Sequence, residues 1–207
     1  MKKKNKIVPV FIILAVLLFI LAFYFMTKDK GNTKTVEEVK TVDNIEKKEF
    51  DYILYDNKSD LYKEYFAKLK EELLKDDIND QEYAKIVAQL FVIDFYSLAD
   101  KKTNTDVGGL DFIYSDMREN FILKATDTIY KYVESNVYGD RKQELPKIKA
   151  VEVKSADAKP LTYDKITDGL GYIVTVSITY EKDLGFPKEV TLYLIHQKKK
   201  LYIVEVK

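Results

Sequence analysis

Two residues of this chain have the chemistry and the surroundings to raise the question of catalysis, and the first is its single histidine. His196 continues an alternating apolar run, Val190, Leu192 and Leu194, where an imidazole can serve as a general base or a metal ligand. The alternative is a packed or half-exposed side chain at the end of a strand. A zinc site is disfavoured because the chain has no cysteine and no second histidine.

The second residue is Asp94, which falls among the aromatic residues Phe91, Phe95 and Tyr96. A carboxylate in apolar surroundings has a raised pKa, which suits it to proton transfer, as in cone-fold isomerases. The structural alternative is a capping or salt-bridged acid at the margin of a helix's buried face. Asp94, Tyr96 and His196 together make the candidate pocket of the sequence.

The chain lacks the sequence motifs that mark common active sites. It has no glycine-flanked serine elbow and neither of the two common glycine-rich phosphate loops. It also has no cysteine, which removes disulfides, thiolate chemistry and a lipoprotein attachment site. We therefore expect no catalytic residue, no cofactor and no metal, and we expect that the protein is not an enzyme.

The least regular part of the chain is the segment 100–114, which lies between two predicted helices. Irregular loops that contain glycine often carry recognition when a rigid scaffold positions them. The candidate partner-binding residues of this loop are Asp106, Gly108, Gly109, Asp111 and Tyr114. A purely structural turn into the following helix is the alternative interpretation.

Three segments that precede this loop or follow it repeat apolar residues at the helical spacing of three and four. They begin at Ser59 or Asp60, at Asp80 and at Ser115, and the first two end near Lys75 and Leu98. The third carries its apolar face on Met117, Phe121, Ala125, Thr128, Ile129 and Tyr132. These faces predict helices that pack on a common core.

From residue 147 onward the apolar residues repeat with a period of two, which predicts half-buried strands. Strands are expected at 147–154, 172–180, 190–194 and 201–206, after a short edge strand or extended entry segment at 52–55. Helices followed by an antiparallel meander indicate the α+β class. We expect one domain, residues 50–207, in which three helices pack on a curved antiparallel sheet of about four to five strands.

Residues 7–26 form a run of 20 residues without a charge, which as a helix spans roughly 30 Å, the thickness of a bilayer's hydrocarbon core. Four lysines precede it and predict that residues 1–6 are a cytoplasmic tail and that the domain is extracytoplasmic. A cleaved signal peptide is the alternative, but the end of the run offers no small-residue cleavage site. We expect a single-pass anchor in the cell membrane.

Residues 27–49 are polar, with isolated valines and one isoleucine at helical spacing. A solvated stalk is the preferred interpretation, and a marginal helix or short coiled coil is the alternative. Beyond the four N-terminal lysines the chain carries four more acids than bases. That balance offers no general attraction to nucleic acid, so we expect none as a partner.

The order helix, helix, loop, helix and then four antiparallel strands resembles the nuclear-transport-factor-2-like cone, in which a bent sheet wraps around helices. With a short tail and one membrane helix, the chain resembles the scaffold subunits of type IV secretion and conjugation machines. Two segments, 106–109 and 130–133, also look like parts of anchored proteins from AT-rich Bacillota. The lysine-rich, arginine-poor composition is typical of such a Gram-positive-like bacterium.

These patterns favour a non-enzymatic interaction or scaffold module of the bacterial envelope that docks on envelope proteins or on itself. The resemblance to secretion scaffold subunits implies a place in a secretion or conjugation assembly. The first alternative is a small-ligand-binding cone or degenerate enzyme that uses the interior pocket. A chaperone-like or sorting role for exported chains is a further alternative. The tail of six residues disfavours docking to a cytosolic ATPase.

Overall fold

The computed structural model describes residues 39–45, 47 and 49–207. The expected tail and anchor, and the first part of the expected stalk, lie outside the described residues. Within the described part of the chain, no helix is both long enough and apolar enough to cross a bilayer.

The first two helices begin where side chains cap their free backbone N–H groups. Helix α2 (Asp60–Leu74) starts after Ser59, whose Oγ accepts a hydrogen bond from the N–H of Tyr62 at 3.2 Å. Helix α3 (Asp80–Tyr96) starts after Asn79, whose Oδ1 accepts from the N–H of Glu82 at 3.0 Å. Asp80, where the sequence predicts that this helix begins, is its first helical residue, and the cap is the residue before it.

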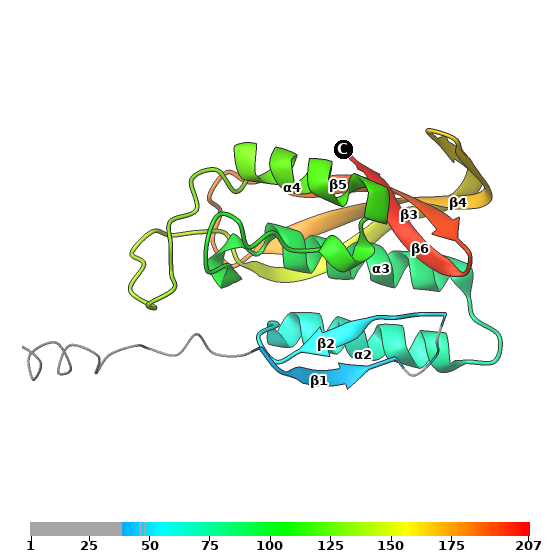
Figure 1. Cartoon of the computed structure of the whole chain (residues 1–207), viewed down its shortest axis with the longest axis horizontal. Coiled ribbons are helices and arrows are strands. Elements are labelled where there is room, and N and C mark those ends of the chain that lie inside the picture. The colour runs from blue at the N-terminus through cyan, green and yellow to red at the C-terminus, as the bar shows by residue number, and fades with distance from the viewer. Residues whose placement is uncertain (1–38, 46, 48) are drawn as a thin grey trace, which may run out of the picture. The chain divides into compact units, whose positions relative to one another are not determined.

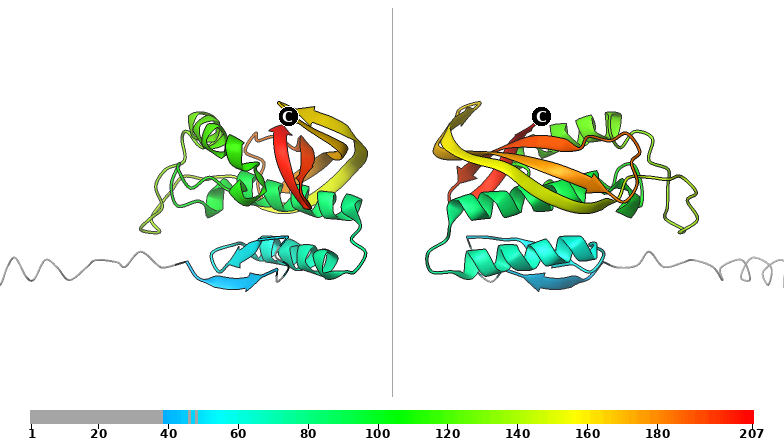
Figure 2. Two further views of the ribbon diagram at one scale, coloured as in Figure 1. Left: turned by 45° about the vertical axis from the view of Figure 1, so that its right-hand side comes forward. Right: turned by 180° about the vertical axis from the view of Figure 1, so that it is seen from behind.

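Helix α3 is the middle layer of the fold (Figures 1 and 2). It contacts α2 on one side and strands β3 and β4 of the main sheet on the other. Eleven of its 17 residues are buried, which is too many for a single apolar stripe and means that the helix is covered on more than one face. A charged side chain on a covered face of α3 therefore needs a partner that replaces water.

The main sheet has four antiparallel strands in the order β3-β4-β5-β6, which confirms the predicted α+β class. The strands are β3 (Ile148–Tyr163), β4 (Ile166–Tyr180), β5 (Glu189–Gln197) and β6 (Lys200–Val206). Bulges interrupt the register of β3 with β4, and bulges bend and twist a strand. Figure 2 shows the resulting curvature, with the far end of the β3–β4 hairpin folding back.

The β3–β4 hairpin is longer than the sequence indicated. Its turn falls at Asp164 and Lys165, and Asp164 takes the left-handed backbone angle φ 52°. Aspartate tolerates that region better than most residues, so the turn is compatible with its sequence. No glycine or proline marked it.

A small second sheet pairs β1 (Thr41–Asn44) with β2 (Ile53–Tyr55), and it lies beside α2 (Figure 1). Strand β1 lies inside the range 27–49 that was expected to be a solvated stalk, and Lys40 before it already exchanges hydrogen bonds with Asp56, so the folded part includes residues well before Phe50. Ile45, which follows the strand, is 5% exposed and belongs to the core. Val39 and Val42, two of the valines at helical spacing, therefore do not lie in a helix.

The third helix is shorter than predicted and is loosely packed. A 3₁₀ turn, η3 (Ser115–Met117), leads into α4 (Arg118–Asp127). Two further 3₁₀ turns, η1 (Leu98–Asp100) and η2 (Leu110–Phe112), lie in the loop before it. Ala125 is the one fully buried residue of α4.

Two tyrosine hydroxyls join the layers inside the core. The hydroxyls of Tyr52 and Tyr83 lie 2.7 Å apart, and the Tyr83 hydroxyl accepts a hydrogen bond from the N–H of Leu201 at 3.1 Å. The Tyr52 hydroxyl in turn donates to the Leu201 carbonyl at 3.4 Å. Segments far apart in sequence are thus joined: the chain before β2, helix α3 and strand β6.

We predict that Tyr83→Phe lowers the free energy of unfolding by about 1 to 3 kcal/mol, because the Leu201 N–H loses its partner in a buried place. The measurement is urea unfolding of the full-length chain in mild detergent. Tyr132→Phe is the matched control, since Tyr132 is 75% exposed. Equal stability of the two variants would contradict a structural role for the Tyr83 hydroxyl.

Candidate functional site

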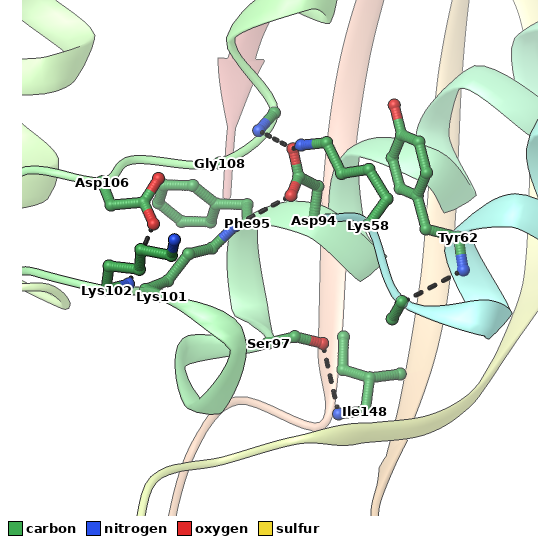
Figure 3. Close-up of polar contacts among 12 residues, drawn as sticks. Lys58, Tyr62, Asp94, Phe95, Ser97, Lys101, Lys102, Asp106, Gly108 and Ile148 are labelled. Atoms are coloured by element: carbon green, nitrogen blue, oxygen red, sulfur yellow. Dashed lines mark hydrogen bonds and ion pairs between the residues drawn. The ribbon is translucent and has the colours of Figure 1, made fainter. Parts of the chain in front are cut away.

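Asp94 lies near the C-terminal end of α3 and is held by three donors (Figure 3). The Nζ of Lys58 is 2.7 Å from Oδ2, and the Nζ of Lys101 is 2.8 Å from Oδ1. The backbone N–H of Gly109 also donates to Oδ2, at 2.7 Å. The carboxylate side chain is 10% exposed, so these donors replace most of its water.

The lysines decide the protonation state of Asp94. Burial by itself raises the pKa of Asp94, but the ammonium groups of Lys101 and Lys58 lower it more, and the net pKa lies well below its usual value. The carboxylate is therefore ionised at any physiological pH. The hypothesis of a raised pKa for proton transfer is wrong, and the salt-bridged alternative describes this residue.

The glycine pair of the loop is packed against α3 rather than presented to solvent. A Cβ at Gly108 would lie 2.2 Å from the Asp94 carbonyl oxygen, and Gly109 has φ +76°. The hydroxyl of Tyr130 accepts from the Gly108 N–H at 3.1 Å and donates to the Phe95 carbonyl at 2.7 Å. These contacts support the structural-turn interpretation for both glycines.

The other candidate residues of the partner loop divide between surface and core. Asp106 and Asp111 are exposed, and Asp106 accepts a hydrogen bond from the N–H of Lys102 at 2.9 Å. Tyr114 is 9% exposed, and its N–H donates to the Ile203 carbonyl at 3.3 Å. The five residues therefore do not form one recognition surface.

His196 is tied to Asp168 by two hydrogen bonds. Asp168 Oδ2 is 2.9 Å from Nδ1 of the ring and accepts from the His196 backbone N–H at 2.6 Å. Burial raises the pKa of Asp168, but hydrogen bonds from His196 and Leu170 lower it more. The buried Nε2 has no hydrogen-bond partner among the described residues and lies 4.0 Å from Asp80 Oδ2.

The three residues of the predicted pocket do not meet. Asp80 opens α3, and Asp94 lies 14 residues later, which at 1.5 Å per residue puts them about 21 Å apart along the helix. His196 is near the first end and Asp94 near the second. Tyr96 is 6% exposed, and burial raises the pKa of its hydroxyl to about 12. The sequence analysis located each residue on its element but could not give the distances between them.

The structure contains a cleft that none of these residues lines. It has a volume of about 740 Å³ and lies between α4 and β6. Its lining residues are Phe95, Ile113, Met117, Asn120, Phe121, Lys124, Ala125, Thr128, Tyr163, Ile203, Val204, Glu205 and Val206. Eight of the thirteen lining residues are apolar and five carry polar side chains, so the cleft is suited to binding an apolar or amphipathic guest.

The apolar face of the third predicted helix is a sequence signal for this cleft, but the sequence alone indicates only that the face packs on the core. Met117, Phe121, Ala125 and Thr128 repeat at helical spacing, which predicted a face packed on the sheet. In the structure Ala125 belongs to the core and Met117 and Phe121 pack against it, as predicted, but all four residues also line the cleft. An apolar helix face indicates that something covers it, and periodicity alone does not say whether the cover belongs to the same chain.

The cleft does not have the residues of a familiar reaction centre. Its ionisable lining residues are Lys124, Tyr163 and Glu205, and no nucleophile stands beside a base there. Within the described part of the chain, no group of three histidine or acidic residues could hold a metal ion.

No protein-family model, curated protein or solved structure matches the chain. The α+β fold and the geometry of the cleft therefore carry the functional argument.

We predict that Asp94→Asn lowers the free energy of unfolding by about 3 to 5 kcal/mol at pH 7, because two lysines lose the charge that compensates them in a buried place. The Asp111→Asn variant is the control, since Asp111 is exposed in the loop that contains Gly109. Urea unfolding of both variants in mild detergent measures the effect. A loss no larger than that of the control would contradict the proposed charge pairing.

The same pairing predicts a dependence on pH. A carboxylate with a lowered pKa in the folded state stabilises the protein above its unfolded pKa, near 3.9, and that contribution is lost as the pH falls toward the folded pKa. The stability gap between wild type and Asp94→Asn should be constant from pH 7 to 5 and should narrow below about pH 4. A gap that stays constant at low pH would contradict the prediction.

Proposed function

We propose that this chain is a membrane-anchored, extracytoplasmic, non-enzymatic interaction module whose cleft between α4 and β6 receives a segment of a partner protein. The observation that carries the proposal is the cleft itself, with its volume of about 740 Å³ and its mainly apolar walls. Concave and mainly apolar pockets of this size are where proteins commonly bind their ligands.

The packing of α4 supports this proposal. Phe121 and Met117 face the cleft and are only partly buried. Ala125 is the one buried residue of the helix. A guest between α4 and β6 would bury more of these side chains. Burial of apolar surface contributes about 25 cal/mol per Å², so the cleft offers a driving force for association.

The sequence supports the proposed location of the protein, anchored in the membrane with its domain outside the cytoplasm. The uncharged run 7–26 after four lysines fits a single-pass anchor with its N-terminus inside. The order of three helices before a curved antiparallel sheet fits the nuclear-transport-factor-2-like cone of secretion scaffold subunits, and on that basis the partner is an envelope protein. Excess acid over base in the rest of the chain argues against nucleic acid as the partner.

The second candidate is a small apolar ligand in the same cleft, whose volume lies within the range of roughly 300 to 1,000 Å³ that is common for ligand pockets. Asp94 and His196 take no part in it, because neither lines the cleft. Native mass spectrometry of the detergent-solubilised chain would detect such a ligand as an added mass.

We predict that a photoreactive p-benzoyl-phenylalanine in place of Asn120, which lies at the exposed rim of the cleft, forms a discrete protein adduct in intact cells. The same group in place of Lys63, on α2, serves as the control position. Thr128→Phe should reduce the Asn120 adduct by filling the cleft from an exposed position of its wall, whereas Ala67→Phe, at an exposed position of α2, should not.

Three results would contradict the proposal. An adduct of equal yield from both photoreactive positions would show contact without specificity. An adduct that Thr128→Phe leaves unchanged would place the partner elsewhere. Absence of a protein adduct, together with an added small mass in the native spectrum, would favour the second candidate.

A further inference from the structure

Strand β6 is an edge strand of the main sheet, and its first half is already covered by the chain itself. The N–H of Leu201 donates to the Tyr83 hydroxyl, as described above. Two residues on, the carbonyl of Ile203 accepts from the N–H of Tyr114, and Ile113 forms a parallel bridge with Ile203. A short extended segment of this chain therefore pairs with the open side of β6 in its middle.

Beyond Ile203 the edge is open. Thr191 and Lys207 exchange two backbone hydrogen bonds, at 2.8 and 2.9 Å, across β5 and β6. In an antiparallel pair the groups of the next residue point the opposite way, so the N–H and C=O of Val206 point away from β5. Val206 also lines the cleft, which means that these groups lie at its wall.

The cleft has the shape that an added strand requires. Helix α4 forms the wall opposite β6, and both figures show the C-terminal end of β6 beside α4 (Figures 1 and 2). Because successive side chains of a strand point to opposite faces, Ile203 lies with the main core and Val204 with a second apolar cluster on the other side of the sheet. The cleft reaches residues of both sides, so it offers contacts to both faces of an inserted strand.

We propose that an extended segment of the partner protein enters this cleft as an added β-strand and pairs its backbone with the N–H and C=O of Val206. The added strand continues the edge pairing that Ile113 and Tyr114 begin. Alternate apolar side chains of the guest contact Phe121 on one side and Tyr163 on the other. This inference rests on the proposed function and specifies how the guest is held.

The geometry disfavours a second copy as the guest. In a second copy β6 is itself flanked by α4 and by the segment at Ile113, so its edge cannot enter a cleft bounded on the far side by another α4. An isolated extended peptide has no such flanks. A small apolar molecule would fill the cleft but would leave the outward groups of Val206 without partners.

The test uses a fluorescein-labelled heptapeptide of alternating valine and threonine with lysine ends, bound to the full-length chain in mild detergent and followed by anisotropy. Val206→Pro removes the outward N–H without touching the pairing with β5, and proline is tolerated on edge strands. Val206→Thr keeps the N–H and nearly the same shape. We expect about tenfold weaker binding for Val206→Pro than for Val206→Thr, the effect of one or two backbone hydrogen bonds.

A second arm leaves the protein unchanged, in case Val206→Pro impairs folding. Two versions of the peptide carry N-methyl groups on alternate residues, one on the odd and one on the even amides. Because only one set faces β6, one version should lose about tenfold in affinity relative to the other. Equal affinities of both versions, or of both Val206 variants, would overturn strand pairing.

The outcomes separate this inference from the proposed function. Where the peptide does not bind, Val206→Pro and Val206→Thr are applied to the cellular adduct formed at position 120. Loss of the adduct with proline alone supports strand pairing. An adduct that survives Val206→Pro overturns strand pairing while cleft binding stands. If neither peptide binding nor an adduct is seen, both proposals fail.

Discussion

The structure depends on the burial of α3 between two layers, and that burial makes the charge on Asp94 the central constraint. A carboxylate with 10% of its surface exposed needs partners that replace water. They come from three places, Lys58 before α2, Lys101 after η1 and the N–H of Gly109. Neutralisation of one charge therefore fixes the turn before α2 and both halves of the loop that follows α3.

That loop links the charged cluster to the cleft. Once Gly108 and Gly109 are held against α3, the chain passes through η2 and brings Ile113 and Tyr114 to the edge of β6. Helix α4 follows directly and becomes the second wall. The residues singled out as a recognition loop thus act mainly as the support of a binding site, and the site itself lies one element further along the chain.

Periodicity identified the three helices and the four main strands, because apolar spacing reports directly on burial. It could not identify the partners of Asp94, since Lys58 precedes it by 36 residues and no local pattern connects them. It also could not separate His196 from Asp94, because distance along α3 appears only when the layers are assembled. The face of α4 was recognised as apolar, but whether the chain or a guest covers it depends on tertiary packing.

The way α4 is attached has a mechanical consequence. The chain before it is fastened to β6 through Tyr114, and the chain after it is fastened to α3 through Tyr130, whereas Ala125 alone is fully buried between these points. The two ends of this helix are therefore held more firmly than its middle, which can shift more easily. A wall of this kind accommodates guests of unequal bulk, so selectivity would arise from chain direction and spacing more than from any single side chain.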